Sequence, residues 1–218
     1  MENHYEIREG GVTYSLGRKK GEQIIYDFPK ILDYLQVKGK KLFGEHFRIY
    51  EEDRDLLYRL SNYFIRDLRN CEKLKLDPNK GILLSGPVGC GKTSFMRLFK
   101  FITPAQRPYE VVSSRNITFG FNHLGFKTVQ DYGDSGYFCF DDLGLEPPGK
   151  FFGQECEVMG EILLSRHDLF QKHKLRTHAT TNLSASEIEE RYGERVRSRM
   201  RQMFNQVSFQ KNAKDKRK

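Results

Sequence analysis

Glycine, lysine and threonine stand at a fixed spacing in the stretch GPVGCGKTS, residues 86–94. Gly86, Gly91, Lys92 and Thr93 match the pattern G-x-x-x-x-G-K-[ST] without a mismatch. Glycines let successive backbone N–H groups converge on one anion, and a helix that starts there adds partial positive charge. The pattern predicts a phosphate-binding loop rather than a plain glycine-rich turn, with Lys92 on the β- and γ-phosphates. The candidate nucleotide contacts are Gly86, Pro87, Val88, Gly89, Cys90, Gly91, Lys92, Thr93 and Ser94.

A pair of carboxylates follows an apolar run further along the chain. The run is residues 137–140, and the pair is Asp141 and Asp142. Taken alone, such a run is often a strand that leads into an exposed loop. Together with the phosphate-binding loop, it predicts that Thr93 and Asp141 hold the Mg²⁺ that accompanies ATP. Asp142 is then expected to orient or deprotonate the attacking water.

The candidate residues need a scaffold, and apolar runs that alternate with helical patterns supply one. Strands are expected at 81–85, 109–113, 137–141, 175–181 and 204–209. Helices are expected near 51–73, 93–103, 116–124, 154–171, 185–192 and 195–203. Strands separated by helices predict an α/β fold in which a parallel sheet carries helices on both faces. In that fold the phosphate-binding loop joins a strand to a helix.

The two ends of the chain differ in character. Residues 1–47 are polar and punctuated by glycine, with at most one short amphipathic helix around 26–35 that Pro29 would break. The net charge is +8, and residues 191–218 contain ten Lys or Arg and two Asp or Glu, so 10 − 2 accounts for all of it. This distribution predicts that the C-terminal end meets a polyanion. A solvated basic tail that aids solubility is the alternative.

The apolar runs, the first residues and the cysteines indicate where the protein is located and whether its thiols are oxidised. Its apolar runs are far shorter than the roughly 20 residues of a membrane helix, and its first residues do not form a secretory signal. A cytoplasmic protein that does not enter a membrane is therefore expected. The four cysteines lack the spacing of a zinc site or a disulfide framework, which indicates reduced thiols.

Four motifs in order resemble the AAA+ ATPases, and within them the DnaC/IstB group of helicase loaders and transposition helper ATPases. They are GPVGCGKT (86–93), FDDLG (140–144), TTN (180–182) and YGERVRSRM (192–200). The likeness covers about residues 50–210. It implies a P-loop NTPase of AAA+ type with a parallel five-stranded sheet flanked by helices. It also implies an N-terminal extension at 1–47 that could bind a partner, an ATPase core at 48–210, a basic tail at 211–218, and a reduced or absent lid.

The resemblance also implies further roles. Asn182 matches the sensor-1 position, where a polar side chain helps to place water beside Asp142; a turn-forming asparagine before a helix is the alternative. Arg199 matches the arginine finger that reaches the nucleotide of a neighbouring subunit, and Arg195 is the other candidate. Many AAA+ enzymes have glutamate at the position of Asp142, so the shorter side chain predicts slow turnover.

Such proteins assemble as homo-oligomers, in a ring or a spiral, through nucleotide-bridged interfaces. The implied partners are a replicative helicase or a transposase, together with single-stranded DNA. Besides the basic C-terminal end, a segment with interleaved aromatic and basic residues is a candidate DNA contact, although its aromatics could equally be packing residues; it contains Arg115, Phe119, Phe121, His123, Phe126 and Lys127. Two other functions stay open: a nucleotide-switched adaptor with negligible hydrolysis, and a monomeric P-loop kinase for a small molecule.

Overall fold

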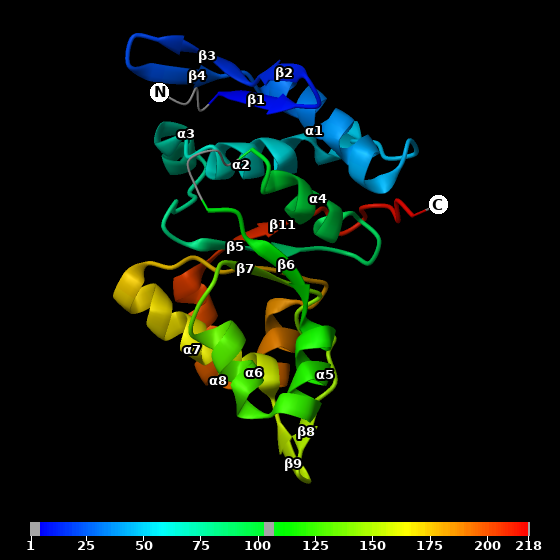
Figure 1. Ribbon diagram of the computed structural model, residues 1–218, viewed down its shortest axis with the longest axis vertical. Coiled ribbons are helices and arrows are strands. Elements are labelled where there is room, and N and C mark those ends of the chain that lie inside the picture. The colour runs from blue at the N-terminus through cyan, green and yellow to red at the C-terminus, as the bar shows by residue number, and fades with distance from the viewer. Residues whose placement is uncertain (1–4, 103–106, 218) are drawn as a thin grey trace. The chain divides into compact units, whose positions relative to one another are not determined.

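The computed structural model describes residues 5–102 and 107–217 and is drawn in Figure 1. Its elements, in chain order, are β1 (Glu6–Glu9), β2 (Val12–Ser15), β3 (Gly17–Lys20), β4 (Gln23–Tyr26), α1 (Phe28–Phe43), η1 (Glu51–Asp53), α2 (Arg54–Phe64), α3 (Leu68–Lys73), β5 (Gly81–Ser85), α4 (Lys92–Phe99), β6 (Glu110–Ser113), α5 (Ser114–Leu124), α6 (Phe126–Gly133), β7 (Phe138–Asp141), β8 (Gly149–Phe151), β9 (Gln154–Cys156), α7 (Val158–His173), β10 (His178–Thr181), α8 (Ala185–Met203) and β11 (Phe204–Ser208). Contacts divide the chain into two compact units. The first has residues 1–76 and 94–108, and the second has 77–93 and 109–218.

The first unit begins with two antiparallel hairpins, β1–β2 and β3–β4, where the sequence indicated little regular structure. The predicted break at Pro29 is wrong, because α1 runs for 16 residues from Phe28. Pro29 lies in the first turn, where a backbone N–H has no intrahelical partner to lose. Asp27 caps the helix by accepting a hydrogen bond from the Lys30 N–H.

The single helix expected over 51–73 is also wrong. This segment consists of η1, α2 and α3. The chain turns at Arg66, whose φ is 57°, and Asp67 then accepts a hydrogen bond from the Asn70 N–H to start α3. The apolar spacing continues across this turn, so periodicity alone could not find it. Inside the same unit, the rings of Phe64 and Phe99 stack with their centroids 5.1 Å apart.

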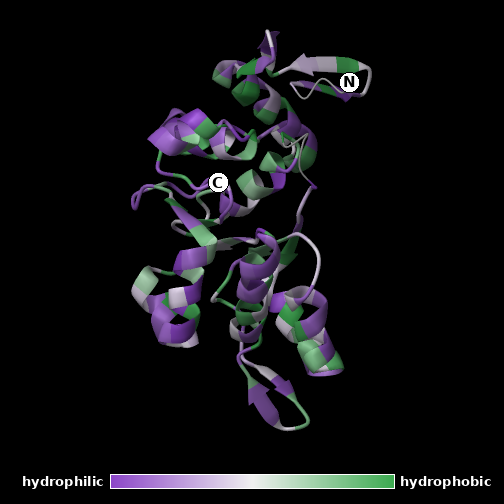
Figure 2. Cartoon of the chain, turned by 90° about the vertical axis from the view of Figure 1, so that its left-hand side faces the viewer, coloured by the Kyte–Doolittle hydropathy of each residue, from purple (hydrophilic) through white to green (hydrophobic). Residues whose placement is uncertain are grey.

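The second unit contains the predicted sheet. Its five strands lie in the order β11-β5-β10-β7-β6, and every neighbouring pair is parallel. Helices α5 to α8 pack on one face through buried side chains that include Phe121, Phe140 and Met200. Figure 2 shows these helices striped with hydrophilic and hydrophobic residues, as expected when one side of a helix packs and the other faces water. The predicted five-stranded parallel α/β fold is confirmed.

Two local predictions in the second unit need correction or refinement. The helix expected from Gln154 begins only at Val158, because residues 149–156 form the hairpin β8–β9. A further helix, α6, follows α5 directly. The two helices expected at 185–192 and 195–203 are joined end to end as α8, with a sharp kink at Gly193. The helix expected over 93–103 is described as α4, and residues 103–106 of that region lie outside the described residues.

A buried histidine fastens β10 to β5. The Nδ1 atom of His178 accepts a hydrogen bond from the Ile82 N–H at 3.1 Å. Burial, and then the charges of Arg176 and Arg166, lower the pKa of His178 to about 3. The ring is therefore neutral near pH 7 and can act as an acceptor in the sheet. Among the described residues, no helix combines the length and the apolar character needed to cross a membrane.

Candidate functional site

The P-loop, defined here as residues 86–94, leaves the sheet at the end of β5 and runs into α4. The strand–loop–helix context that the pattern requires is therefore present. Four of the five residues of β5 are buried, and the strand lies between β11 and β10, so the loop leaves from the interior of the sheet. Gly89 has a φ of 78°, which favours glycine. The loop also touches the next strand, because the Gly86 N–H donates to the Thr181 carbonyl at 3.2 Å.

Lys92 is turned back into the loop. Its ammonium donates to the carbonyl oxygens of Gly86 and Pro87, each at 2.8 Å. Lys92 is only 6% exposed, so these bonds satisfy a charge that burial would otherwise make costly. The backbone thus holds a cation within the turn that is expected to bind phosphate.

Thr93 and Asp141, the predicted metal ligands, are in direct contact. The Thr93 hydroxyl donates to Asp141 Oδ1 at 2.9 Å, and the Thr180 hydroxyl donates to the same oxygen at 2.6 Å. Three elements meet here, because Thr93 lies on α4, Asp141 ends β7 and Thr180 belongs to β10. Hydroxyl and carboxylate oxygens are the ligands that Mg²⁺ prefers. These residues therefore fit a magnesium ion bound through one carboxylate and one hydroxyl.

Asp142 occupies a special backbone position beside this contact. Its φ is 54°, a value uncommon for residues other than glycine, and its N–H donates to the Thr180 hydroxyl at 2.9 Å. Burial of the carboxyl and the nearby charge of Asp141 raise the pKa of Asp142, and the charges of Lys92 and Arg217 oppose that rise. The turn presents an exposed carboxylate next to Asp141.

Asn182 follows the last residue of β10, at the same edge of the sheet. Its Oδ1 atom is buried and has no hydrogen-bond partner within the described chain. A buried acceptor without a partner costs free energy, so such groups usually have a ligand, an ion or water as partner. The alternative, a turn-forming asparagine before a helix, stays open, because Ser184 caps α8 as that alternative expects.

The two candidate finger residues lie on the second half of α8, residues 194–203. Arg195 is exposed and Arg199 is half-buried. Within the described chain, no hydrogen bond or ion pair fixes either guanidinium, and none joins Arg199 to Lys92, Thr93 or Asp141. The structure thus brings together the predicted phosphate and metal ligands and leaves Arg199 outside this cluster. A residue that serves another copy of the chain is expected to have such a position.

Comparisons with known proteins agree with this geometry. No protein-family model matches the sequence. A proteasome-associated ATPase of Kribbella flavida is 36% identical over 88 residues, which cover 40% of this chain but only 14% of that protein. The crystal structure of the DnaC helicase loader superposes with a TM-score of 0.56 at 17% identity, covering 76% of this chain and 95% of that one. The structure of DnaI gives 0.54 at 16% identity, covering 75% and 88%. The chain shares the fold of these two structures.

The described end of the chain reaches the P-loop, which the sequence did not indicate. The Lys216 N–H donates to the Gly89 carbonyl at 3.0 Å. The Asp215 carboxylate lies so close to Gly89 that a Cβ atom there would be 2.1 Å from Asp215 Oδ1. The charge of Arg217, after that of Lys92, opposes the rise in the pKa of Asp142. The segment that was predicted to meet a polyanion is therefore placed, in part, against the phosphate loop.

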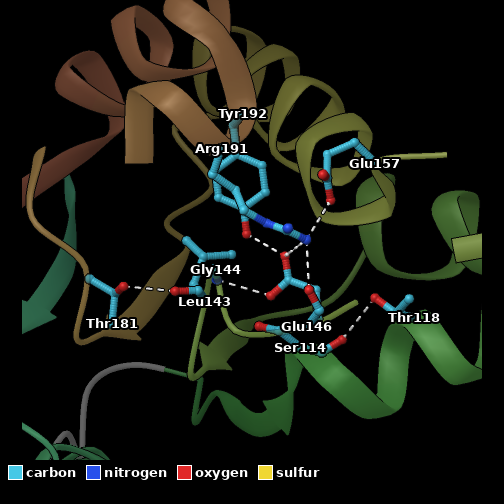
Figure 3. Close-up of polar contacts among 9 residues, drawn as sticks. All are labelled: Ser114, Thr118, Leu143, Gly144, Glu146, Glu157, Thr181, Arg191 and Tyr192. Carbon is cyan, nitrogen blue, oxygen red and sulfur yellow. Dashed lines mark hydrogen bonds and ion pairs between the residues drawn. The ribbon is translucent and has the colours of Figure 1, made fainter. Parts of the chain in front are cut away.

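A second feature missed from the sequence is a buried polar cluster beyond Asp142. Figure 3 shows Glu146 in contact with Gly144, Arg191 and Tyr192, and Arg191 in contact with Glu157. Glu146 lies in a segment, EPPG, that reads as an ordinary exposed turn. No local signal marks its carboxylate as buried, because Arg191 and Tyr192 lie more than 40 positions later in the chain.

Proposed function

We propose that this chain is a Mg²⁺-dependent ATPase of the DnaC/IstB type that assembles through nucleotide-bridged contacts between its copies. In this proposal it acts in the cytoplasm and loads or remodels a DNA-bound partner, either a replicative helicase or a transposase. The observation that carries the proposal is the contact between Thr93 and Asp141 beside a buried Lys92. The likeness of the fold to the DnaC helicase loader supports the assignment to loaders. Because one fold can host many functions, the residues of the site are the main support.

Each residue of the site has a defined task in this proposal. The P-loop amides and Lys92 bind the phosphates, and Thr93 with Asp141 holds Mg²⁺, which when bound neutralises charge on the phosphates. Asp142 orients the attacking water and accepts its proton. Asn182, with its unsatisfied Oδ1, holds the same water in place. Arg199 of one copy contacts the nucleotide of the next.

Changing Asp142 to asparagine tests hydrolysis directly. The amide cannot accept the proton of water, so the rate of phosphate release is expected to fall on the order of 10²-fold. Binding of a fluorescent ATP analogue is expected to stay within about twofold, because Lys92 and the P-loop are untouched. The measurement is phosphate release with ATP and Mg²⁺. The matched control is Asp142→Glu, which keeps a carboxylate and is expected to retain activity.

The same assay separates the alternatives. A nucleotide-switched adaptor would give equal, negligible phosphate release in the wild type and in Asp142→Asn, while still assembling with ATP. A small-molecule kinase would show no ATP-driven change in size on a sizing column. The proposed loader shows both an increase in size with ATP and Mg²⁺ and a rate that depends on Asp142. Chelation of the metal is expected to abolish hydrolysis.

Single-stranded DNA is the proposed nucleic-acid ligand. Phe119 and Phe126 are 40% and 62% exposed, whereas Phe121 is 1% exposed and belongs to the core. The Arg115 guanidinium lies over the Phe119 ring, 5.1 Å from its centroid. Exposed rings beside cationic side chains are suited to stacking on bases while contacting phosphates. Residues 1–47 remain the proposed surface for the protein partner.

Replacing Phe126 with alanine tests the stacking role. Loss of one base–aromatic contact is expected to weaken single-stranded DNA binding by about 1–3 kcal/mol, while the salt dependence stays the same because no phosphate contact is lost. The measurement is fluorescence anisotropy of a labelled oligonucleotide at several salt concentrations. Leu124→Ala is the control, because Leu124 is also exposed, at 57%, but has no ring. Equal effects of the two substitutions would contradict stacking.

A further inference from the structure

Glu146 is a carboxylate buried four residues after Asp142. The exposed fraction of its side chain is 0%. Burying a carboxylate is costly unless it is paired and hydrogen-bonded, and the cost is largest in a loop that has few contacts of its own. A fully buried carboxylate in the segment that follows the hydrolytic residue therefore needs an explanation.

Its partners come from two parts of the chain. Glu146 Oε2 accepts a hydrogen bond from the Gly144 N–H at 2.9 Å, within its own loop. Glu146 Oε1 accepts from the Tyr192 hydroxyl and lies 3.8 Å from the Arg191 guanidinium, both on α8. Arg191 Nη2 also donates to the Glu146 carbonyl at 2.6 Å and to Glu157 at 3.1 Å. Figure 3 shows the carboxylate enclosed between this loop and the helix.

The loop that contains Glu146 is hydrogen-bonded to strand β10 through Leu143. Leu143 donates its N–H to the Thr180 carbonyl at 2.8 Å and accepts from the Thr181 hydroxyl at 2.7 Å. Thr180 in turn donates to Asp141. The Asp142 turn and Glu146 are therefore joined by a short segment in which the Leu143, Gly144 and Leu145 N–H groups are hydrogen-bonded.

The helix side of the cluster lies at the kink of α8. Tyr192 immediately precedes Gly193, whose φ of 81° and ψ of 162° interrupt the helix. Arg199 follows seven residues after Tyr192, about two helical turns away. The direction of the helix changes at Gly193. Glu146 contacts the residue directly before this change, through the Tyr192 hydroxyl.

We propose that Glu146 is a positioning residue that couples the Asp142 loop to the α8 kink, so that the state of one subunit's phosphate site sets the position of the Arg199 it offers to the next subunit. The coupling runs through the Tyr192 hydroxyl and the Arg191 guanidinium. This inference rests on the proposed function, because it assigns a regulator to the same site. It differs from that function in predicting communication between two sites of one chain.

Hydrogen exchange on the full chain tests the coupling without relying on activity. In the wild type, a non-hydrolysable ATP analogue with Mg²⁺ is expected to slow exchange in residues 81–94 and also in 188–203. In Glu146→Gln, which preserves size and removes the charge, 81–94 is expected to respond as before while the response of 188–203 falls by at least about half. Tyr192→Phe removes one hydroxyl and is expected to act in the same direction. Tyr132→Phe, on α6, is the control and is expected to respond like the wild type.

The outcomes separate the two proposals. An unchanged response of 188–203 in both Glu146→Gln and Tyr192→Phe would overturn the coupling, as would a wild type in which only 81–94 responds. A wild type in which 81–94 itself does not respond would overturn the proposed function, and the coupling with it. Two variants are used because Tyr192→Phe keeps the chain folded if a glutamine at position 146 does not.

Mixed assemblies give a readout that a purely local role would not affect. One chain carries Asp142→Asn, which silences its own site while keeping nucleotide binding, and supplies Arg199; the other carries Arg199→Ala and supplies a working site. Adding Glu146→Gln to the first chain is expected to lower phosphate release at least about tenfold, because misplacing a catalytic group by about 1 Å has effects of this size or larger. An unchanged rate would overturn the inference, since the altered loop belongs to a site that hydrolyses nothing.

Discussion

Replacing Lys92 with alanine is expected to reduce kcat/KM for ATP hydrolysis on the order of 10³-fold. The ammonium is the only side-chain cation that the structure holds inside the P-loop among the described residues, where it donates to Gly86 and Pro87. Cationic clamps on phosphoryl groups act in a desolvated site, where each donor contributes about 10²–10³ in rate. Loss of ground-state binding to the phosphates adds to this.

The measurement combines titration of a fluorescent ATP analogue with phosphate release. Arg97→Ala is the matched control, because Arg97 is an exposed cation on the same helix, α4, and lies outside the P-loop. It is expected to leave both quantities within about twofold. If Lys92→Ala still bound the analogue with wild-type affinity, the P-loop would not be the nucleotide site. Lys92→Ala leaves the Gly86 and Pro87 carbonyls without their hydrogen-bond donor. Circular dichroism therefore checks that this variant stays folded.

Replacing Arg199 with alanine is expected to lower the rate of hydrolysis in the assembled protein on the order of 10³-fold, while nucleotide binding stays within about twofold. A guanidinium stabilises charge on the transferring phosphoryl group and contributes about 10³–10⁵ in the systems where it acts as a finger. Its planar fork and permanent charge suit that task better than a lysine would. Arg199 is half-buried and unattached within the described chain, so its loss leaves the fold unaffected.

Arg195 is the matched control and also the competing assignment. It lies one turn earlier on α8 and is exposed. If Arg195→Ala lost hydrolysis and Arg199→Ala did not, the finger would be Arg195. A mixture of Arg199→Ala with Lys92→Ala is expected to recover part of the activity, because each chain supplies what the other lacks at a shared interface. No recovery under conditions where both assemble would contradict a role between subunits.

Sequence patterns were most informative where the chain is buried on both sides. The strand 81–85 has a continuous apolar run because it lies inside the sheet, and its glycine-rich sequel marked the P-loop. Asp141 could be paired with Thr93 in advance because a phosphate-binding loop calls for an acidic group that holds its metal ion. These features depend on local composition and on one chemical requirement.

Patterns failed where the deciding contact is distant or where strands are exposed. The hairpin β1–β2 has four-residue strands with no buried position, so it lacks the alternation that marks a half-buried strand. Its Gly10 and Gly11 both have positive φ and are a turn signal that the polarity of the region obscured. The buried carboxylate of Glu146 depends on Arg191 and Tyr192, which no spacing rule connects to it.

The bond between the Lys216 N–H and the Gly89 carbonyl has a practical consequence for protein production. Any polypeptide fused shortly after Arg217, such as a purification tag or a fluorescent protein, would follow a segment that is hydrogen-bonded to the bend proposed to receive phosphate. Its bulk would strain or break that bond. The measured ATP affinity would then be that of the fusion protein and would differ from that of the unfused chain. A reporter dye attached there would, for the same reason, register nucleotide arrival directly.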